Sequence, residues 1–462
     1  MWDETSGEKS QVVLPEGADA PVISADGRFI AYTIQGQSYD TPDHPATEIP
    51  LWLLDRESGK AYQVASYATT ATRALYPQGP NIFLMLEWLA DTHRLLVQVY
   101  PEPSQQGALQ PTGDLYLVDV EQRSSELLLQ AGAYERISIR PDGGQIAALD
   151  TPAFNEEGDV DFDALQDGQL TLIDASTGTV TFRMPTRLHA DPWAMIEPTY
   201  SPDGKYAAWN SENGFAIVNT ETGELQEIAL KNTCLPETCY WTDFMPVFWL
   251  PDSRSFYTLT TINDFFDERA ETTLHQVFIE PEPRVETVTV IHANTWSFYF
   301  SPDRRSVSYW NQPDPDTLDT PAGRKTMNWI TFYLMDLEQL EPRHYMAEFS
   351  LRNLGWSPNN QQFTASFSPQ GGSNQRMVQM ALGDICQPPK SIDMPRNTSY
   401  QRIRWIDEER LLAWGVSNMG SPSGEYLYFF RLGQQGEPIL LGDVAPNPYE
   451  PIGGAQVVVI RR

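Results

Sequence analysis

A short phrase recurs along this chain of 462 residues, and it constrains the fold more than any other feature. It consists of an apolar approach, a turn of the Pro-Asp-Gly kind and an alternating apolar run, and its clearest copy is Ser201–Trp209 (SPDGKYAAW). It returns about every 50 to 65 residues, which indicates that one supersecondary unit has been repeated. The eight copies centre on Asp26, Asp91, Asp142, Asp203, Asp252, Asp303, Asn359 and Asp407.

Each unit divides into four short strands, which in the copy around Asp203 we expect at 197–200, 205–209, 215–219 and 225–230. A second phrase recurs between the third and fourth strands, as in Asp55–Gly59 (DRESG). Both phrases are typical of turns, because Pro presets φ, Asp bonds its own backbone and Gly takes a positive φ. Four Trp residues precede first turns, where we expect them to pack between repeats: Trp88, Trp249, Trp356 and Trp405.

A sheet of four antiparallel strands has two apolar faces, and both faces are buried when successive sheets stack around an axis. We therefore predict an all-β repeat protein, a single β-propeller of eight four-stranded blades, with seven blades as the alternative. The phrase SPDGKYAAW resembles the repeat of TolB-like propellers, and it is similar to the propeller domains that precede the hydrolase domain of prolyl oligopeptidases and dipeptidyl peptidases. This resemblance implies the fold but no single activity, because binding proteins and enzyme lids share the repeat.

The resemblance runs from about Gln11 to Leu441, and we assign residues 11–444 to the propeller. Residues 445–462 then form a C-terminal tail that offers a closing strand. Two strand-like segments, 11–14 and 455–460, are candidates to fasten the ring.

The repeats are longer than four short strands and their turns require. The additional residues lie mostly between the second and third strands. Seven such segments hold 95 residues, with 17 acidic side chains against three basic ones. Second-to-third connections all leave one end of an up-and-down sheet, so we expect a single acidic, proline-rich face, called here the loop face. Its segments are 35–50, 100–113, 151–169, 262–273, 311–328, 368–375 and 417–424.

Loops on a rigid scaffold are where binding sites collect, so the loop face is the predicted binding face. The alternative is that these segments merely tolerate insertion and that their acidity keeps them solvated. The candidate binding residues are Asp40, Asp43, Glu156, Glu157, Asp264, Asp267, Asp314 and Asp316.

The net charge of −31, from 62 acidic and 31 basic side chains, argues against nucleic acid and anionic membranes as partners. The longest apolar run, 81–100, contains four charged or titratable residues, so no membrane span is expected. We predict protein–protein interaction with a partner that has a cationic surface. A charge that serves only solubility is the alternative, and the oligomeric state is left open.

The cysteines bear on the cellular compartment of the protein. Cys234 and Cys239 lie in a short polar segment where a disulfide would close a small ring, and Cys386 is expected as a buried thiol. The first residues, MWDETSGEKSQ, lack the pattern of a signal peptide. We expect a secreted, extracytoplasmic protein, periplasmic or extracellular in its mature form, with the cytoplasm as the alternative.

Catalytic signatures are scarce. The chain has no Gly-x-Ser-x-Gly elbow, and its six His show no pair at metal-ligand spacing, so neither a peptidase of the similar families nor a transition-metal site is expected. Four alternating carboxylates could converge on Ca²⁺, the one cofactor considered, although Ala164 and Leu170 depart from the EF-hand pattern, and a solvated acidic loop is the alternative. These carboxylates are Asp159, Asp161, Asp163 and Asp167.

The sequence therefore favours a non-catalytic binding or scaffold protein that recognises a partner through an acidic, loop-rich propeller face. Two alternatives stay open. One is a carbohydrate- or peptide-active enzyme with its site in the central funnel. The other is a structural subunit of a larger assembly.

Overall fold

The computed structural model describes strands and turns, and no helix, in 20 stretches of the chain and at one further position. These are residues 12, 14–15, 18–34, 49–67, 82–89, 93–101, 114–129, 136–150, 167–187, 197–211, 214–230, 246–262, 271–291, 298–311, 329–348, 351–367, 376–381, 390–392, 398–417, 425–432 and 439–444.

The described residues form eight four-stranded antiparallel sheets, numbered here in chain order, each made of four consecutive strands. Sheets 1 and 2 comprise β1 (Ala18–Ile23), β2 (Phe29–Ile34), β3 (Ile49–Asp55), β4 (Lys60–Tyr67), β5 (Ile82–Trp88), β6 (Arg94–Pro101), β7 (Leu115–Asp119) and β8 (Ser124–Leu129). Sheets 3 and 4 comprise β9 (Arg136–Ile139), β10 (Gln145–Asp150), β11 (Asp167–Asp174), β12 (Val180–Arg187), β13 (Thr199–Tyr200), β14 (Tyr206–Ser211), β15 (Gly214–Asn219) and β16 (Leu225–Ala229).

The second half of the chain repeats this order. Sheets 5 and 6 comprise β17 (Phe248–Trp249), β18 (Ser255–Ile262), β19 (Glu271–Phe278), β20 (Arg284–Ile291), β21 (Tyr299–Phe300), β22 (Ser306–Asn311), β23 (Trp329–Asp336) and β24 (Pro342–Glu348). Sheets 7 and 8 comprise β25 (Leu351–Trp356), β26 (Gln362–Phe367), β27 (Arg376–Ala381), β28 (Lys390–Ile392), β29 (Thr398–Trp405), β30 (Arg410–Ser417), β31 (Glu425–Arg431) and β32 (Ile439–Val444).

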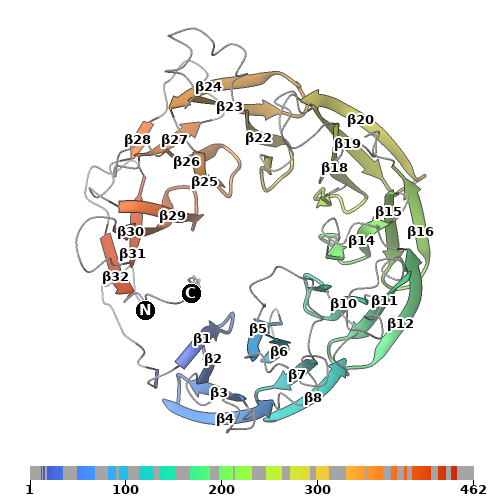
Figure 1. Cartoon of the computed structure of the whole chain (residues 1–462), viewed down its shortest axis with the longest axis vertical. Helices are drawn as coiled ribbons and strands as arrows, with labels where there is room; N and C mark the ends of the chain where they lie inside the picture. The colour runs from blue at the N-terminus through green and yellow to red at the C-terminus, as the bar shows by residue number, and fades with distance from the viewer. Residues whose placement is uncertain are drawn as a thin grey trace, which may run out of the picture.

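The sheets follow one another around a ring (Figure 1). Fourth strands such as β4, β8, β12 and β20 lie on the outer rim, and first strands such as β1, β5 and β29 lie nearer the centre. An array of up-and-down sheets around an axis is a β-propeller arrangement.

Two expected boundaries shift. The segment expected over 151–169 ends earlier, because β11 already begins at Asp167 and its ladder with β10 reaches the pair Asp150 and Gln169. Likewise β19 begins at Glu271, where it pairs with the last residue of β18, Ile262. In both cases the third strand begins earlier than expected, because a neighbouring strand continues to offer it hydrogen-bond partners. The alternation of side chains alone does not reveal where this pairing begins.

The turns between first and second strands share one hydrogen-bonding pattern. Ser201 Oγ donates to Asp203 Oδ1 at 2.7 Å and accepts the Tyr206 N–H at 3.0 Å, while the Lys205 N–H donates to Asp203 at 2.9 Å. Gly204 supplies the left-handed backbone, with φ of 74°. The same serine-to-Asx bond recurs in three other sheets, at Ser24 and Asp26, Ser301 and Asp303, and Ser357 and Asn359.

The turns between third and fourth strands are equally uniform. Asp174 Oδ1 accepts the backbone N–H groups of Ser176 at 2.8 Å and Thr177 at 2.9 Å, and Gly178 has a φ of 68°. Asp55, Asp119, Asn219 and Asp336 accept equivalent bonds. Both phrases are confirmed as turns, and both lie at the end of the sheets opposite the loop face. This end, with the turns around Asp26, Asp55 and their equivalents, is called here the turn face.

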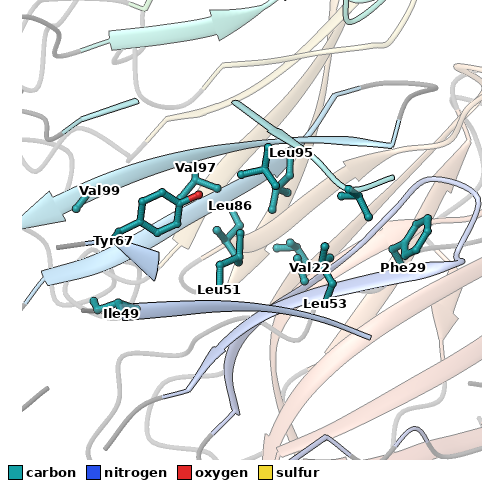
Figure 2. Close-up of a cluster of buried hydrophobic side chains, with 13 residues drawn as sticks. Val22, Phe29, Ile49, Leu51, Leu53, Tyr67, Leu86, Leu95, Val97 and Val99 are labelled. Atoms are coloured by element: carbon teal, nitrogen blue, oxygen red, sulfur yellow. The ribbon is translucent and has the colours of Figure 1, made fainter. Parts of the chain in front are cut away.

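The hydrophobic core lies between neighbouring sheets. Figure 2 shows the first cluster, in which Leu51 and Leu53 of sheet 1 meet Leu95 and Val97 of sheet 2, all four with no exposed surface. Four further clusters join sheets 2 and 3, 3 and 4, 4 and 5, and 5 and 6. A sheet between two others is therefore buried on both faces, which explains why second and third strands such as β14 and β15 are buried almost throughout, whereas outer fourth strands such as β16 are partly exposed.

Tryptophan side chains on first strands join each sheet to the preceding one. Trp249 Nε1 of sheet 5 donates to the Thr199 carbonyl of sheet 4 at 2.8 Å. The expected packing role of the four Trp residues is confirmed, because the other three make the same contact. These bonds run from Trp88 to Val22 at 3.2 Å, from Trp356 to Tyr299 at 3.1 Å and from Trp405 to Gly355 at 3.0 Å.

Replacing Trp249 tests this contact. Trp249→Phe removes a buried N–H donor and leaves the Thr199 carbonyl without it, so we expect a loss of roughly 1 to 2 kcal/mol in the free energy of unfolding beyond the effect of smaller volume. The matched control is Trp52→Phe, because the buried Trp52 Nε1 makes no hydrogen bond. Urea denaturation measures both variants, and equal losses would contradict the role of the bond.

Candidate functional site

The predicted binding carboxylates lie outside the described residues. This holds for Asp40, Asp43, Glu156, Glu157, Asp264, Asp267, Asp314 and Asp316, for the calcium candidates Asp159, Asp161 and Asp163, and for Cys234 and Cys239. Asp167 is the exception: it is the first residue of β11, opposite Arg187 on β12. The predictions that rest on these residues stay predictions.

The described strands nevertheless locate the ends of the acidic segments. The chain leaves sheet 1 after Ile34 and re-enters it at Ile49, and it leaves sheet 3 after Asp150 and re-enters it at Asp167. Since every sheet runs up and down in the same order, all the second-to-third connections begin and end on one side of the ring. In sheet 4 the connection is a tight turn between Ser211 and Gly214, as expected.

The described part of the chain bears on two further features, metal-ion sites and membrane-spanning helices. Within it, no group of three or more His, Cys, Asp or Glu side chains is placed to hold a metal ion. The same residues include no helix of the length and apolarity that crossing a membrane requires.

A cleft of about 440 Å³ lies at the turn face between sheets 1 and 2. Sequence reasoning missed it, because its walls come from turns about 60 residues apart in the chain. The one available signal was Arg123, which takes a φ of 55° at a position that three other repeats give to Gly, at Gly59, Gly178 and Gly223. The cleft is lined by Arg28, Phe29, Asp55, Ser58, Lys60, Ala61, Tyr62, Val120, Glu121 and Arg123.

Two of the cationic side chains that line the cleft lie over aromatic rings. The Arg123 guanidinium lies 4.1 Å from the centre of the Tyr62 ring, and the Arg28 guanidinium lies 4.7 Å from that of Phe29. Arg28 also approaches two carboxylates, Asp55 at 3.6 Å and Glu57 at 3.4 Å. The contact with Glu57 is made by the buried Nε of Arg28, as an ion pair without hydrogen-bond geometry.

His93 bridges two turns at the edge of this cleft. Its Nε2 lies 2.9 Å from Asp26 Oδ2 of sheet 1, and its Nδ1 lies 2.8 Å from Glu121 Oε1 of sheet 2. The hydrogen bond to Asp26 raises the pKa of His93, and Glu121 adds to the rise against a smaller opposing effect of burial. Burial also acts on Asp26, but hydrogen bonds from Ser24, the Arg28 N–H and His93 outweigh it and lower its pKa to about 2.

His275 on β19 behaves in the opposite way. It is buried, its Nε2 lies 2.8 Å from Thr260 Oγ1, and its Nδ1 lies 3.4 Å from Thr287 Oγ1. Burial lowers the pKa of His275, so the imidazole is neutral near pH 7. This histidine is a core residue, whereas His93 connects two sheets through carboxylates that favour its charged form.

No protein-family model and no curated protein matches the chain. It is similar to solved structures at low identity. The β-propeller domain of the Trilobed protease from Pyrococcus furiosus, described as having an open velcro topology, shares 12% identity over 78% of this chain and 98% of its own, with a TM-score of 0.37. Porphyromonas gingivalis dipeptidyl peptidase 4 shares 11% over 81% and 55%, with a TM-score of 0.48. Oligogalacturonate lyase from Vibrio parahaemolyticus shares 11% over 78% and 88%, with a TM-score of 0.39. These similarities carry no argument about activity.

The two histidines predict opposite titrations. Because the folded-state pKa of His93 is above 6.5, its bridge stabilises the fold fully below pH 6.5 and is lost as the pH rises through the folded pKa. For His275 the contribution is present above pH 6.5 and is lost as the pH falls through its lowered pKa. NMR titration, assigned with His→Gln variants, should place His93 above and His275 below 6.5.

The double variant Asp26→Asn with Glu121→Gln is the control for this titration. It removes both negative partners, so the pKa of His93 should return towards 6.5 while that of His275 stays unchanged. A His93 that titrates below 6.5 in the wild type would contradict the bridge.

Calcium binding has a direct test. If Asp159, Asp161 and Asp163 converge on Ca²⁺, added Ca²⁺ should raise the melting temperature and a chelator should lower it, since ligands stabilise the state that binds them. A triple Asp→Asn variant at these positions should lose the response. Differential scanning calorimetry measures it, and an unchanged melting temperature in the wild type would remove the calcium prediction.

Proposed function

We propose that this chain is a non-catalytic binding or scaffold protein that recognises a cationic protein partner through its loop face. The observation that supports this most is the charge of the second-to-third segments, with 17 acidic side chains against three basic ones. Those segments begin and end on one side of the ring of sheets. A field of one sign on one face steers an oppositely charged partner and repels others.

The turn face provides the contrast. Its first-to-second turns hold nine acidic and six basic side chains, its third-to-fourth turns hold ten acidic and two basic ones, and several of these side chains pair. Arg140 lies 2.7 Å from Asp142, and Lys205 lies 2.6 Å from Glu280 of the next sheet. Part of the charge on this face forms bridges within and between sheets, and the acidic excess of its turns, 11, is smaller than the excess of 14 in the loop-face segments.

The same proposal includes the form of the scaffold and its location. The eight sheets act as the eight blades of one propeller within residues 11–444, closed by contact between sheets 8 and 1 with a terminal strand as the fastener. The protein works outside the cytoplasm, where Cys234 and Cys239 form a disulfide. A closed ring gives the first and last sheets a neighbour on both faces, as the other sheets have, which supports a rigid platform for the loop face.

One observation favours a second candidate function, an enzyme with its site in the central funnel. Glu87 lies on β5, a first strand near the centre of the ring, and burial raises its pKa with a further rise from the negative charge of Glu197 (Figure 1). Glu197 precedes β13 of sheet 4, so these carboxylates come from sheets that are not neighbours. A carboxyl group with a raised pKa that interacts with a second carboxyl group is an arrangement that acid–base chemistry can use. Turnover of an oligosaccharide or peptide library that is lost in both Glu87→Gln and Glu197→Gln would favour the enzyme.

Neutralising the loop face tests the binding role. The variant Glu156→Gln, Glu157→Gln, Asp264→Asn and Asp267→Asn should bind an octalysine peptide about tenfold more weakly at low salt, since four surface charges contribute roughly 0.2 to 1 kcal/mol each. Isothermal titration calorimetry measures the affinity, and the difference should shrink at 0.5 M salt.

The matched control neutralises four exposed acids of the turn face. In Glu221→Gln, Glu224→Gln, Glu282→Gln and Glu338→Gln the net charge changes equally, but the affinity should change less than about twofold. Equal losses in the two variants would show that total charge, rather than the loop face, attracts the peptide.

A further inference from the structure

The cleft between sheets 1 and 2 contains acidic residues that are already engaged. Asp55 Oδ1 accepts the backbone N–H groups of Glu57 at 3.0 Å and Ser58 at 3.4 Å, and Asp55 Oδ2 faces Arg28 at 3.6 Å. Glu121 Oε1 is held by His93 at 2.8 Å. Both carboxylates therefore have partners other than Lys60 and Arg123, the remaining cations of the cleft.

Two of the cations have no such partner. Within the described part of the chain, neither the Lys60 ammonium nor the Arg123 guanidinium forms an ion pair, although acidic side chains outnumber basic ones two to one overall. Arg123 instead lies on the Tyr62 ring, which holds the guanidinium in place. Arg28, in contrast, is already paired, since its Nε lies 3.4 Å from Glu57 Oε2 and its Nη2 lies 3.6 Å from Asp55 Oδ2. Lys60 and Arg123 therefore bring two positive charges to this cleft that no carboxylate among the described residues pairs with.

The residues that line the cleft and its volume indicate which class of ligand the cleft would bind. Phe29, Ala61, Tyr62 and Val120 supply apolar surface, and a volume of about 440 Å³ is in the range of small-molecule sites. Beneath the cleft, Phe29 belongs to the buried cluster of Figure 2, so this wall rests on the core. The carboxylates of Asp55 and Glu121 would repel a doubly charged phosphate more than a single carboxylate.

We propose that this cleft is a binding site for a small carboxylate that carries a flat apolar group. The carboxylate lies between Arg123 and Lys60, which form charge-assisted hydrogen bonds with it, and the apolar group packs on the Tyr62 side of the cleft. The site is independent of partner binding at the loop face. A free aromatic acid and the C-terminal carboxylate of a peptide share this chemistry.

Calorimetric titration of the whole chain with phenylacetate tests the site. Phenylacetamide, which has the same shape without the charge, should bind at least about tenfold more weakly, because a charged acceptor is lost. Inorganic phosphate should bind more weakly than phenylacetate. A pentapeptide that ends in phenylalanine distinguishes the sources: tighter binding than phenylacetate indicates a peptide terminus, and weaker binding indicates a free acid, and both outcomes support the site.

Variants connect the binding to the cleft. Lys60→Met and Arg123→Gly should each weaken phenylacetate binding about tenfold, and glycine suits the left-handed backbone at position 123. The control is Arg183→Met, an exposed cation on the outer strand β12, which should leave the affinity unchanged. If Arg123→Gly does not fold, Lys60→Met carries the test.

Three results would overturn the proposal. They are the absence of binding by both phenylacetate and the pentapeptide at 10 mM, equal binding of phenylacetamide, or an unchanged affinity in Lys60→Met with a wild-type melting temperature.

Discussion

Packing between neighbouring sheets is the interaction on which the other features of this protein depend. A four-stranded sheet has two faces, and a sheet such as sheet 4 buries both: Ala207 and Trp209 pack towards sheet 3, and Tyr206 and Ala208 pack towards sheet 5. Apolar burial has no direction, so it does not by itself fix how one sheet is placed against the next. The directional bond from Trp249 to the Thr199 carbonyl, repeated at three other boundaries, supplies that constraint on the inner strands.

The two ends of the ring differ because the turns leave little room for variation at one of them. Each first-to-second turn needs an Asx acceptor, and most use a Ser and a residue with positive φ, so its few positions are committed to backbone bonds. Even the residue with positive φ can serve the next boundary, since Ser253 Oγ accepts the Asp203 N–H at 3.1 Å and Asn360 Oδ1 accepts the Asp303 N–H at 3.2 Å. In the sequence, insertions and acidic residues accumulate instead in the second-to-third segments.

Local patterns explain which features the sequence predicted. The eight repeats, the four strands of each and the two turn types depend on residues within about ten positions of one another, and the structure agrees with all of them. The packing role of Trp249 was also predictable, because an indole recurs at one position of the repeat. Strand ends were less predictable, as at Asp167, because a strand continues for as long as its partner offers hydrogen bonds.

The cleft and the histidine bridge are features of another kind. His93 and Asp26 are 67 positions apart, and Tyr62 and Arg123 are 61 apart, so no local pattern connects them. From the residues alone, His93 was one of six histidines without a pair at metal-ligand spacing, and Arg123 was not singled out. The repeat and its turn chemistry, written in short-range preferences, determined the sheets and the side on which acidity collects. Which side chains of neighbouring sheets meet was decided by the stacking of those sheets, because stacking brings together residues that the chain keeps a whole repeat apart.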